Sequence, residues 1–478
     1  MKTFAVIHAR LSSSRLKHKV IKNFCGNPMI SFQIQRLKKS KLVDRIIVAT
    51  TNKKEDDKIV KLAIENNVNF SRGSQNDVLK RIFYSVKKNN PKFIIRISGD
   101  NPLIDPEIVD LVIKELHSGK YDHVSSFAQP SYPYGVGCAG FTFEALEEAF
   151  LKTRNRLDRE NVEPYMLKTR EIKTLYLKAP KKLHKPDIRV TVDTSFDFEK
   201  VEKCAEFLLR KYGISFRTKE IIEYFENCKI LVVANGSVGL KCIRNLVSKN
   251  QRILGIVLSK NDEYSLNTKI KKASNLVKED IHQTNSLSSS ATKKWILSRN
   301  PDIILSLWSR LIFPKEIIKK VPRGIINLHN SLLPLARGGE ANIWPIIENH
   351  DAGVSIHYIN EEIDQGPIIF QKKIKKYDWD TGKTLFMRLE RELVALFIKN
   401  WEKIKFCNVN LKKQEGKTTY HKRRESNKFR EIFKKKKYTG ERIIDILRAF
   451  SFSPYDGAYF IDKDGKKIDI KVSLKKLK

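Results

Sequence analysis

The chain has 478 residues, with 92 Lys and Arg against 54 Asp and Glu and a formal net charge of +38. This length exceeds what one hydrophobic core serves, and a hydrophobic fraction of 41% suffices for globular folding, so we expect two or three domains. No apolar run approaches the length of a membrane-spanning helix, and the N-terminus has no secretory signal pattern, which predicts a cytoplasmic protein without a membrane partner.

Cysteine usage and the distribution of charge narrow the class further. The six cysteines are scattered and none forms a CxxC pair, which indicates reduced thiols rather than a disulfide framework or a zinc site. Lysines occur throughout the chain rather than in one stripe, so most of the positive charge reflects composition. The densest basic run, residues 428–438, is typical of a solvated segment, and a nucleic-acid partner is not expected.

The first half of the chain alternates apolar β-type runs with amphipathic helical patterns. Such alternation predicts βαβ units and a mostly parallel sheet. The expected strands are residues 4–9, 44–51, 92–100 and 188–194, and the expected helices are residues 28–40 and 56–67.

A basic turn, HARLSSSRLKHKV, begins at the end of the first expected strand. Arg10, Arg15 and Lys19 lie in it, and Ser14 is the last of its three serines. A strand-to-helix turn points backbone N–H groups and the positive end of a helix at an anion, and arginine can donate two hydrogen bonds to phosphate oxygens. The turn therefore predicts a phosphate site, although an exposed basic turn is an equally open reading.

Two aspartates end expected strands of this half. Asp100 follows Gly99 in RISGDNPLIDP, and Asp193 ends VTVD. The carboxyl ends of parallel strands meet at one edge of a sheet, so the two carboxylates could share Mg²⁺, which takes few protein oxygens and leaves room for a triphosphate. A lone carboxylate at such a place is often only a helix N-cap, and both alternatives stay open.

This half resembles the cytidylyltransferases that activate acidic sugars, and most of all their spore-coat-polysaccharide branch. The supporting motifs are ARLSSSRLKHKV, NPMISFQIQRLKKS, RGSQNDVLKRIF, RISGDNPLIDPEIVD, DRENVEPYM and VTVDTSFDFEKVE, in order over residues 2–209. The resemblance implies a doubly wound nucleotide-diphospho-sugar transferase-like fold and Mg²⁺-dependent transfer of a cytidylyl group from CTP to a nonulosonate-like sugar. The residues that it implies are Arg10, Ser14, Arg15, Lys19, Arg72, Asp77 and Gly99 for the nucleotide, and Asp100 and Asp193 for the metal.

The strand and helix pattern restarts near Cys228. A strand, a glycine turn, a helix and a second strand occupy residues 228–259, directly after a helical stretch, which marks a domain boundary. A polar, lysine-rich linker is expected at residues 411–419. The further expected elements are strands at residues 301–308, 324–329, 353–359 and 366–373, and, in the tail, a helix at residues 440–450 and short strands at residues 457–462 and 466–474.

A polar triplet marks the second half. Asn327 and His329 lie two residues apart where a strand ends, so their side chains share one face, and Asp364 lies in a turn between the next two expected strands. A carboxylate can hold an imidazole protonated, and a charged imidazole beside an amide can stabilise an oxyanion, which suits acyl transfer. Since no serine or cysteine occupies a nucleophile elbow, the triplet predicts direct attack by a substrate amine.

The second half resembles the folate-dependent formyltransferases. The supporting motifs are KILVVANGSVGL, NLHNSLLPLARGG and GVSIHYINEEIDQGPIIFQ, over residues 229–404. The resemblance implies a Rossmann-like α/β domain and 10-formyltetrahydrofolate as the formyl donor. The site residues that it implies are the catalytic Asn327, His329 and Asp364, and the folate-lining Leu311, Ile312 and Asp364.

The tail is similar to the small α+β C-terminal domain of sugar-nucleotide formyltransferases. The similarity implies that the tail covers an amino-sugar acceptor, although an ordinary small core explains the same side chains equally well. The acceptor residues that it implies are Tyr420, His421, Phe452 and Tyr455. Dimers are common in both families, so the resemblance also implies a homodimer.

These features together predict a bifunctional transferase that acts on small molecules in polysaccharide biosynthesis, with domains at residues 1–227, 228–410 and 411–478. One half would make a cytidine-activated sugar, and the other would formylate a sugar amine. One alternative is a methionyl-tRNA formyltransferase-type enzyme with an accessory nucleotide-binding domain, which the sugar-type tail disfavours. The other is a non-catalytic RNA-binding protein, which would show basic patches with interleaved aromatic residues.

Overall fold

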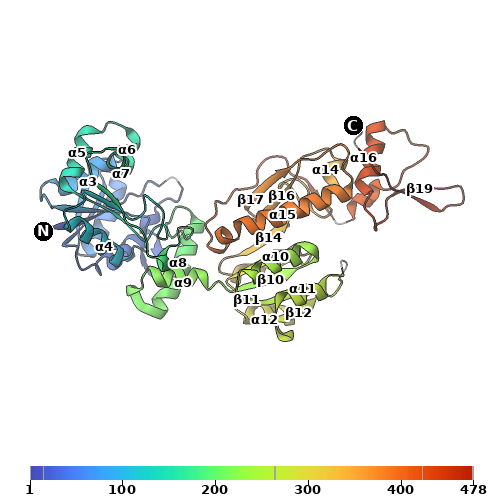
Figure 1. The fold of residues 1–478 in the computed structure, drawn as a ribbon, viewed down its shortest axis with the longest axis horizontal. Coiled ribbons are helices and arrows are strands. Elements are labelled where there is room, and N and C mark those ends of the chain that lie inside the picture. The colour runs from blue at the N-terminus through green and yellow to red at the C-terminus, as the bar shows by residue number, and fades with distance from the viewer. Residues whose placement is uncertain (1, 14, 263–264, 423, 476–478) are drawn as a thin grey trace. The chain divides into compact units, whose positions relative to one another are not determined.

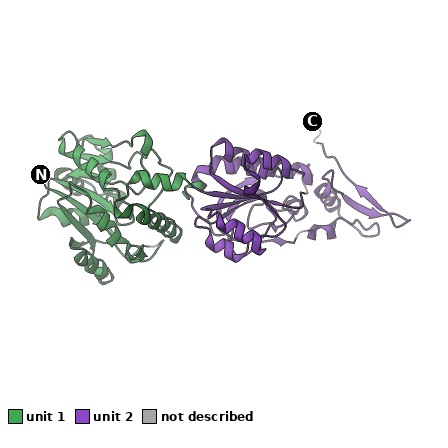
Figure 2. Ribbon diagram, turned by 90° about the horizontal axis from the view of Figure 1, so that it is seen from below, with its two compact units in different colours: residues 1–227, 405–408 green, residues 228–404, 409–478 purple. Residues whose placement is uncertain are grey.

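A computed structural model of the chain describes residues 2–13, 15–262, 265–422 and 424–475. The chain divides into two compact units (Figure 2). The first comprises residues 1–227 together with residues 405–408, and the second comprises residues 228–404 and 409–478. A four-residue segment therefore belongs to the first unit although the chain reaches it only after the sheet of the second.

A seven-stranded mixed sheet forms the centre of the first unit, in the order β5-β4-β1-β6-β8-β7-β9. β8 runs antiparallel to β6 and β7, and the other neighbouring pairs are parallel. The strands are β1 (Thr3–His8), β4 (Arg45–Thr51), β5 (Asn69–Gly73), β6 (Phe93–Ser98), β7 (His123–Ser125), β8 (Ala139–Thr142) and β9 (Thr174–Tyr176), with a separate ribbon of β2 (Asn23–Phe24) and β3 (Asn27–Pro28). The loop after the central β1 opens at the carboxyl edge of the sheet, where α/β proteins bind ligands.

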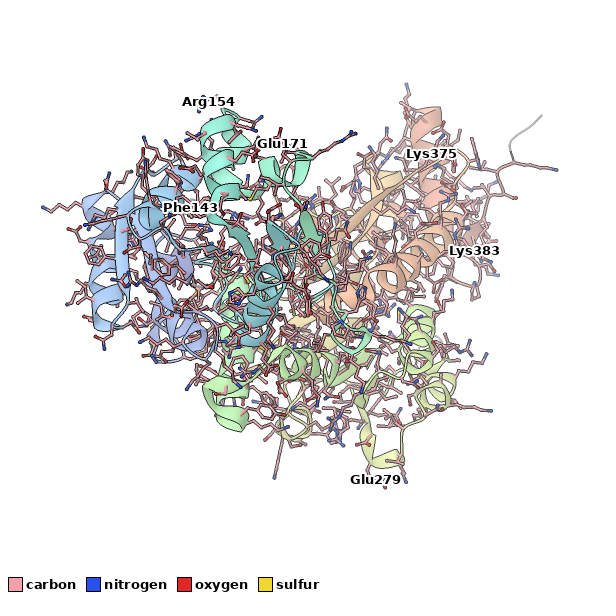
Figure 3. All side chains as sticks on the ribbon, turned by 60° about the vertical axis from the view of Figure 1, so that its left-hand side comes forward. Phe143, Arg154, Glu171, Glu279, Lys375 and Lys383 are labelled. Carbon is pink, nitrogen blue, oxygen red and sulfur yellow. The ribbon has the colours of Figure 1, made fainter. Side chains whose placement is uncertain are left out.

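Helices cover both faces of this sheet, as the alternating pattern predicts (Figure 1). One face packs against α1 (Met29–Leu37), α2 (Asp57–Glu65), α4 (Pro106–His117), α8 (Ser195–Tyr212) and α9 (Thr218–Glu226). The other face packs against α3 (Val78–Lys87), α5 (Phe143–Lys152) and α7 (Glu163–Lys168), with α6 (Arg156–Asn161) beside α3. Figure 3 shows Phe143 at the start of α5 and Arg154 and Glu171 just beyond the ends of α5 and α7. The Phe143 ring stacks on Phe83 of α3 at 5.9 Å between centroids, which joins these helices.

The segment of residues 188–194 is not a strand of this sheet, so that prediction is wrong. The segment is extended, but only Arg189 forms a bridge, to Tyr134. Its alternate apolar residues are nevertheless buried in the core of the unit. The alternation that suggested a strand is therefore real, and it reflects burial on one side of an extended segment that pairs with no neighbouring strand. Thr194 ends the segment as the N-cap of α8.

The second unit is built around another seven-stranded sheet, in the order β12-β11-β10-β13-β14-β16-β17. The first five strands are parallel, and β16 and β17 are antiparallel to their neighbours. The strands are β10 (Ile230–Ala234), β11 (Ile253–Ser259), β12 (Ile281–Thr284), β13 (Ile303–Leu307), β14 (Ile325–His329), β16 (Ala352–Tyr358) and β17 (Ile368–Ile374). The structure confirms every strand predicted here and adds β12, a short edge strand.

Six helices with bounds in the described residues accompany this sheet, namely α10 (Gly236–Ser248), α11 (Asn267–Ser274), α12 (Ser290–Ser298), α13 (Lys315–Lys320), α14 (Trp344–Ile347) and α15 (Gly382–Lys405). α15 buries a stripe of large apolar side chains at intervals of four residues, which are Leu385, Leu389, Leu393, Phe397 and Trp401. This spacing places them on one face of the helix. Within the described residues, no helix has the length and apolar content needed to cross a membrane.

The tail forms a small α+β arrangement, as predicted. It consists of α16 (Gly440–Phe450), which packs against α14, and an antiparallel hairpin of β19 (Ala458–Ile461) and β20 (Lys467–Ile470). Before it, β18 (Tyr420–His421) pairs in parallel with β15 (Arg337–Gly338), which lies in the loop after β14. Within the segment expected to be a linker, Lys412 forms an antiparallel bridge with Ile368 of β17, so this segment is tied to the main sheet by backbone pairing.

Candidate active sites

Lys19 lies between two aspartates at the carboxyl edge of the first sheet. Its Nζ is 3.3 Å from Asp100 Oδ2 and 3.3 Å from Asp193 Oδ1, and it donates a hydrogen bond of 2.7 Å to the carbonyl of Val192. Asp100 follows β6, whereas the extended segment before α8 brings Asp193 alongside. Asp100 and Asp193 thus lie on either side of one ammonium group, and carboxylate oxygens are the kind of ligand that suits Mg²⁺, so the metal assignment stays a prediction.

Two arginines also contact Asp193. Arg15 Nη2 is 2.8 Å from Asp193 Oδ1, and Arg189 Nη2 donates to Asp193 Oδ2. The Arg15 side chain is 65% exposed, so its ion pair is screened by solvent and opens at little cost when a ligand arrives. Arg189 was not predicted, because it precedes the motif VTVD and lies four residues before the aspartate.

Arg10 and Gly99 shape the loop after β1. Arg10 Nη1 donates a hydrogen bond of 2.8 Å to the carbonyl of Gln75. A Cβ on Gly99 would lie 2.9 Å from the Cβ of Ala9, so the backbone after β6 approaches this loop to a distance that only glycine permits. Ser14, the other predicted nucleotide contact of this loop, lies outside the described residues.

Arg72 and Asp77 have partners inside the protein. Arg72 Nη1 donates to the carbonyl of Thr51 at 3.0 Å, and its Nη2 pairs with Asp57. Asp77 is the N-cap of α3, and its other carboxylate oxygen accepts a hydrogen bond of 2.6 Å from Arg159 Nε. These contacts give both residues a structural role, and their contact with a nucleotide stays a prediction.

A second polar cluster forms where β14 ends. Asn327 and His329 lie on one face of this strand and are 9% and 8% exposed. His329 Nε2 lies 3.2 Å from the carbonyl of Ala336, in the loop that follows the strand. The buried amide and imidazole are therefore held side by side at the strand's carboxyl end, as the two-residue spacing predicts.

Asp364 completes this cluster from the loop between β16 and β17. Its Oδ1 is 3.4 Å from Asn327 Nδ2, and its Oδ2 is 3.8 Å from His329 Nδ1. The backbone N–H of Gly338 donates a hydrogen bond of 2.9 Å to Oδ2. Asp364 has a φ of 53°, in the left-handed region that an aspartate adopts only where neighbouring contacts hold it.

The carboxyl group of Asp364 is strongly favoured in its charged form. Burial alone would raise its pKa, but the electrostatic influence of His329 and the hydrogen bond to His357 outweigh burial. The net result is a pKa well below the ordinary carboxyl value. Asp364 therefore provides a fixed negative charge next to the amide and the two imidazoles.

His357 is a member of this cluster that the sequence analysis missed. It stands opposite Asn327 in the antiparallel pairing of β14 with β16. Its Nε2 is 3.1 Å from Asn327 Nδ2 and 3.5 Å from Asp364 Oδ1, and its Nδ1 is 2.8 Å from the carbonyl of Tyr358. Because a carbonyl only accepts, Nδ1 donates in that contact, and Nε2 faces both the amide of Asn327 and the carboxylate of Asp364. Only the strand register reveals this contact.

The predicted folate-lining residues lie in the loop after β13. Leu311 packs against an apolar cluster that includes Phe313 and Ile317. Ile312 is 71% exposed. One of the two side chains thus supports the core of the domain, while the other is available to a ligand, and contact with folate stays a prediction for both.

Three of the four predicted acceptor residues of the tail, His421, Phe452 and Tyr455, make ring contacts within the second unit. The His421 ring stacks on Trp344 at 3.5 Å between centroids, and the Phe452 ring lies 5.2 Å from that of Tyr455. Tyr420 and Tyr455 are each 50% exposed. These contacts give His421 and Phe452 a packing role, and contact of the four side chains with a sugar stays a prediction.

Three family models match the chain in succession. They describe a cytidylyltransferase over residues 4–228, a formyl transferase over residues 227–400 and an N-formyltransferase dimerization C-terminal domain over residues 425–476. The chain is a fusion of a cytidylyltransferase with a formyltransferase. It is therefore a transferase enzyme, and each of its two catalytic domains is an α/β domain built around a mixed β-sheet.

Known proteins are similar to parts of this fusion. An uncharacterized protein of Methanocaldococcus jannaschii is 36% identical over 248 residues, which are 52% of this chain and 99% of that protein. A spore coat polysaccharide biosynthesis protein of Bacillus subtilis is 28% identical over 205 residues, which are 41% of this chain and 83% of that protein. A dTDP-4-amino-4,6-dideoxyglucose formyltransferase of Mycobacterium bovis is 27% identical over 176 residues, which are 36% of this chain and 73% of that protein.

The two sites of this cytidylyltransferase–formyltransferase differ in the number of positively charged side chains that contact the central carboxylate. In the cytidylyltransferase domain, Arg15, Lys19 and Arg189 all contact Asp193. In the formyltransferase domain, a carboxylate stands beside imidazole and amide groups. The first arrangement suits a polyanionic ligand, and the second suits a reacting carbonyl group.

Proposed function

We propose that the two domains act on one class of substrate, an amino sugar that is activated for polysaccharide biosynthesis. The cytidylyltransferase domain transfers a cytidylyl group from CTP to a nonulosonate-like sugar, and the formyltransferase domain transfers a formyl group from 10-formyltetrahydrofolate to a sugar amine. The observation that supports this most directly is the fusion itself, since one chain holds a cytidylyltransferase domain and a complete Asn327, His329 and Asp364 cluster.

In the cytidylyltransferase domain, Arg10, Arg15 and Lys19 bind the triphosphate of CTP. Asp100 and Asp193 are the residues that would hold Mg²⁺, because both already lie within 3.3 Å of one cationic nitrogen. When bound, the ion supplies neutralisation of the triphosphate charge. The basic side chains orient the α-phosphorus toward a sugar hydroxyl oxygen, whose attack forms the new P–O bond as the bond to pyrophosphate breaks.

In the formyltransferase domain, Asn327 and His329 donate hydrogen bonds to the formyl oxygen. The contact of 3.4 Å from Asn327 Nδ2 to Asp364 is long, so a substrate oxygen replaces this contact, whereas the contact of 3.1 Å between Asn327 Nδ2 and His357 Nε2 is kept. The sugar amine attacks the formyl carbon and oxygen charge develops in the tetrahedral intermediate. The C–N bond to the folate then breaks, and the amine proton passes to the departing folate nitrogen.

We place this enzyme in the cytoplasm as a homodimer that associates through its tail, the segment that matches a dimerization domain. Leu311 and Ile312 line the folate pocket, and Tyr420, His421, Phe452 and Tyr455 lie around the sugar acceptor. Sedimentation of the purified chain tests the dimer, since a monomer at micromolar concentration would contradict it.

Mass spectrometry of reaction products tests the proposed function. The full chain is incubated with CTP, Mg²⁺, 10-formyltetrahydrofolate and a panel of amino sugars and their nucleotide derivatives. We expect a product that gains one cytidylyl group and one formyl group. Asp100→Asn should abolish only the first gain and His329→Ala only the second, so each variant is the control for the other. A panel in which no sugar gains either group would refute the proposal.

A further inference from the structure

Gln414 lies between α15 and β18, and all of its hydrogen-bonding groups are in use. Its Nε2 donates hydrogen bonds of 2.8 Å to the carbonyl of Asp364 and 2.8 Å to the carbonyl of Gly366. Its Oε1 accepts from Arg337 Nε at 3.1 Å and from Arg337 Nη2 at 2.7 Å. A side-chain amide offers two N–H groups and one oxygen, so Gln414 is fully engaged by two loops of the formyltransferase domain.

The loop that Gln414 holds is tightly constrained. Asp364 has a left-handed backbone with φ 53°, and a Cβ on Gly366 would lie 1.8 Å from the carbonyl oxygen of Tyr358. A left-handed aspartate persists only where surrounding contacts hold it. The two bonds from Gln414 are such contacts, because they bind the carbonyl of Asp364 itself and that of the glycine two residues later.

The other loop held by Gln414 also contacts the Asp364 carboxylate. Gly338, the neighbour of Arg337, donates its N–H to Asp364 Oδ2 at 2.9 Å. The N–H of Arg337 donates to the carbonyl of Thr419 at 2.9 Å, in the segment just before β18. The backbone and the carboxylate of Asp364 are therefore connected through Gln414 and Arg337 in one hydrogen-bonded loop.

We infer that Gln414 is a positioning residue for formyl transfer, which fixes the loop of Asp364 so that its carboxylate stays beside Asn327 and His329. The inference rests on the proposed formyl transfer. Gln414 lies beyond residues 227–400, the segment that matches the formyl transferase family. The segment between the two formyltransferase domains thus completes the support of the catalytic cluster.

Gln414→Leu tests this inference, since leucine fills similar space without an amide. Displacement of a catalytic group by about 1 Å can cost about 10²-fold in rate, so we expect a loss of that order in kcat with little change in the KM of either substrate. Gln251→Leu is the matched control, because Gln251 Nε2 also donates to a backbone carbonyl, that of Lys249 at 2.7 Å, in a turn of the same unit. The control should keep wild-type kcat.

A double-mutant cycle separates positioning from a general structural role. If Gln414 acts through Asp364, then Gln414→Leu should cause no further loss of kcat in an Asp364→Asn enzyme. Arg337→Lys, which keeps one donor toward Gln414, should retain more kcat than Arg337→Leu. The inference would be overturned if the fold-loss of kcat in the double variant equalled the product of the losses in Gln414→Leu and Asp364→Asn.

Hydrogen exchange gives a readout that does not depend on activity. We expect the amide of Gly338, whose acceptor is the Asp364 carboxylate, to exchange faster in Gln414→Leu and at the wild-type rate in Gln251→Leu. Unchanged exchange in Gln414→Leu would overturn the inference whatever the enzyme transfers. Faster exchange in a chain that transfers no formyl group would instead refute the proposed function and leave the positioning contact established.

Discussion

At the scale of single residues, Asp364 shows how much one side chain depends on distant neighbours. Its carboxylate accepts from Gly338, lies near two imidazoles and keeps a lowered pKa although it is buried. Its left-handed backbone is held by a glutamine fifty positions later in the chain. The charge and the backbone conformation of this residue both depend on the fold, and each can be tested by experiment.

The lowered pKa of Asp364 makes stability depend on pH. Because the folded carboxyl has a lower pKa than the unfolded one, the unfolded state binds more protons in acid. The resulting stabilisation is present above the ordinary carboxyl pKa of about 4 and is lost as the pH falls below it. We expect the difference in free energy of unfolding between wild type and Asp364→Asn, measured in urea, to narrow from neutral to acidic pH. A difference that stays constant over this range would contradict the lowered pKa.

The cluster of Asn327, His329 and Asp364 should act as one unit in formyl transfer. Loss of one oxyanion donor, in Asn327→Ala, should raise the barrier by about 3 kcal/mol. His329→Ala alone should cost about as much as His329→Ala combined with Asp364→Asn, because these groups depend on one another. Transfer is followed by the mass shift of the acceptor. Near wild-type rates in His329→Ala would remove this histidine from the mechanism, and cytidylyl transfer is the internal control.

At the scale of elements, the pairing of β15 with β18 joins the catalytic loop to the tail. Only two residues pair on each side, Arg337 with Tyr420 and Gly338 with His421. Gly338 has a φ of 91°, and a Cβ there would lie 2.2 Å from the carbonyl oxygen of His421. The pairing therefore depends on glycine, both for its conformation and for the close approach of the two backbones.

Gly338→Ala should consequently reduce formyl transfer much more than a comparable change elsewhere. The added methyl group would push β18 away and move the N–H that binds Asp364. Gly465→Ala is the control, since Gly465 also has a positive φ, of 77°, but a Cβ there meets nothing within 4 Å. We expect kcat of formyl transfer to fall at least tenfold in the first variant and to stay unchanged in the second. Equal effects on kcat would show that the β15–β18 pairing does not support the site.

At the scale of the whole molecule, the first unit is not contiguous in sequence. Residues 405–408 belong to it, and Phe406 is 4% exposed within its main apolar cluster. The buried Lys200 donates from Nζ to the carbonyl of Cys407 at 3.1 Å. The cytidylyltransferase unit therefore uses a segment that follows the sheet of the formyltransferase domain, so its stability depends on the full chain.

Phe406→Ala should destabilise the first unit by about 3 kcal/mol, the cost of removing a buried phenylalanine side chain. Under the proposed function, CTP binds this unit and raises its stability, so the unfolding transition that moves to higher temperature on addition of CTP belongs to this unit. We expect the transition that CTP shifts to occur at lower temperature in the variant, as recorded by calorimetry. Phe433→Ala, at a phenylalanine that is 52% exposed in the tail, should leave it unchanged. If both variants melt like wild type, Phe406 contributes nothing to this core.

The sequence by itself determined the features that depend on local pattern. Apolar runs located β1, β4 and β6 of the first sheet and every strand of the second except β12, whereas the short strands β5, β7, β8 and β9 were not predicted. The side chains at a strand end, Asn327 and His329, follow from the two-residue period. Resemblance to two families indicated the enzyme class, which the family matches confirm. These signals are local or carried by contiguous motifs, so they are readable without the fold.

Only the tertiary structure decided which distant residues meet. His357 joins the cluster because β14 and β16 pair in one register, and a shift of one residue would turn it to the other face of the sheet. Gln414 and Phe406 reach their partners through contacts over many residues. The composition around Gln414 predicts only a linker, and no element was predicted around Phe406. In residues 188–194, apolar and polar side chains alternate as in a strand, but the segment forms one isolated bridge and no sheet ladder. Strand pairing depends on a neighbouring strand, and the pattern within one segment does not show whether such a neighbour is present.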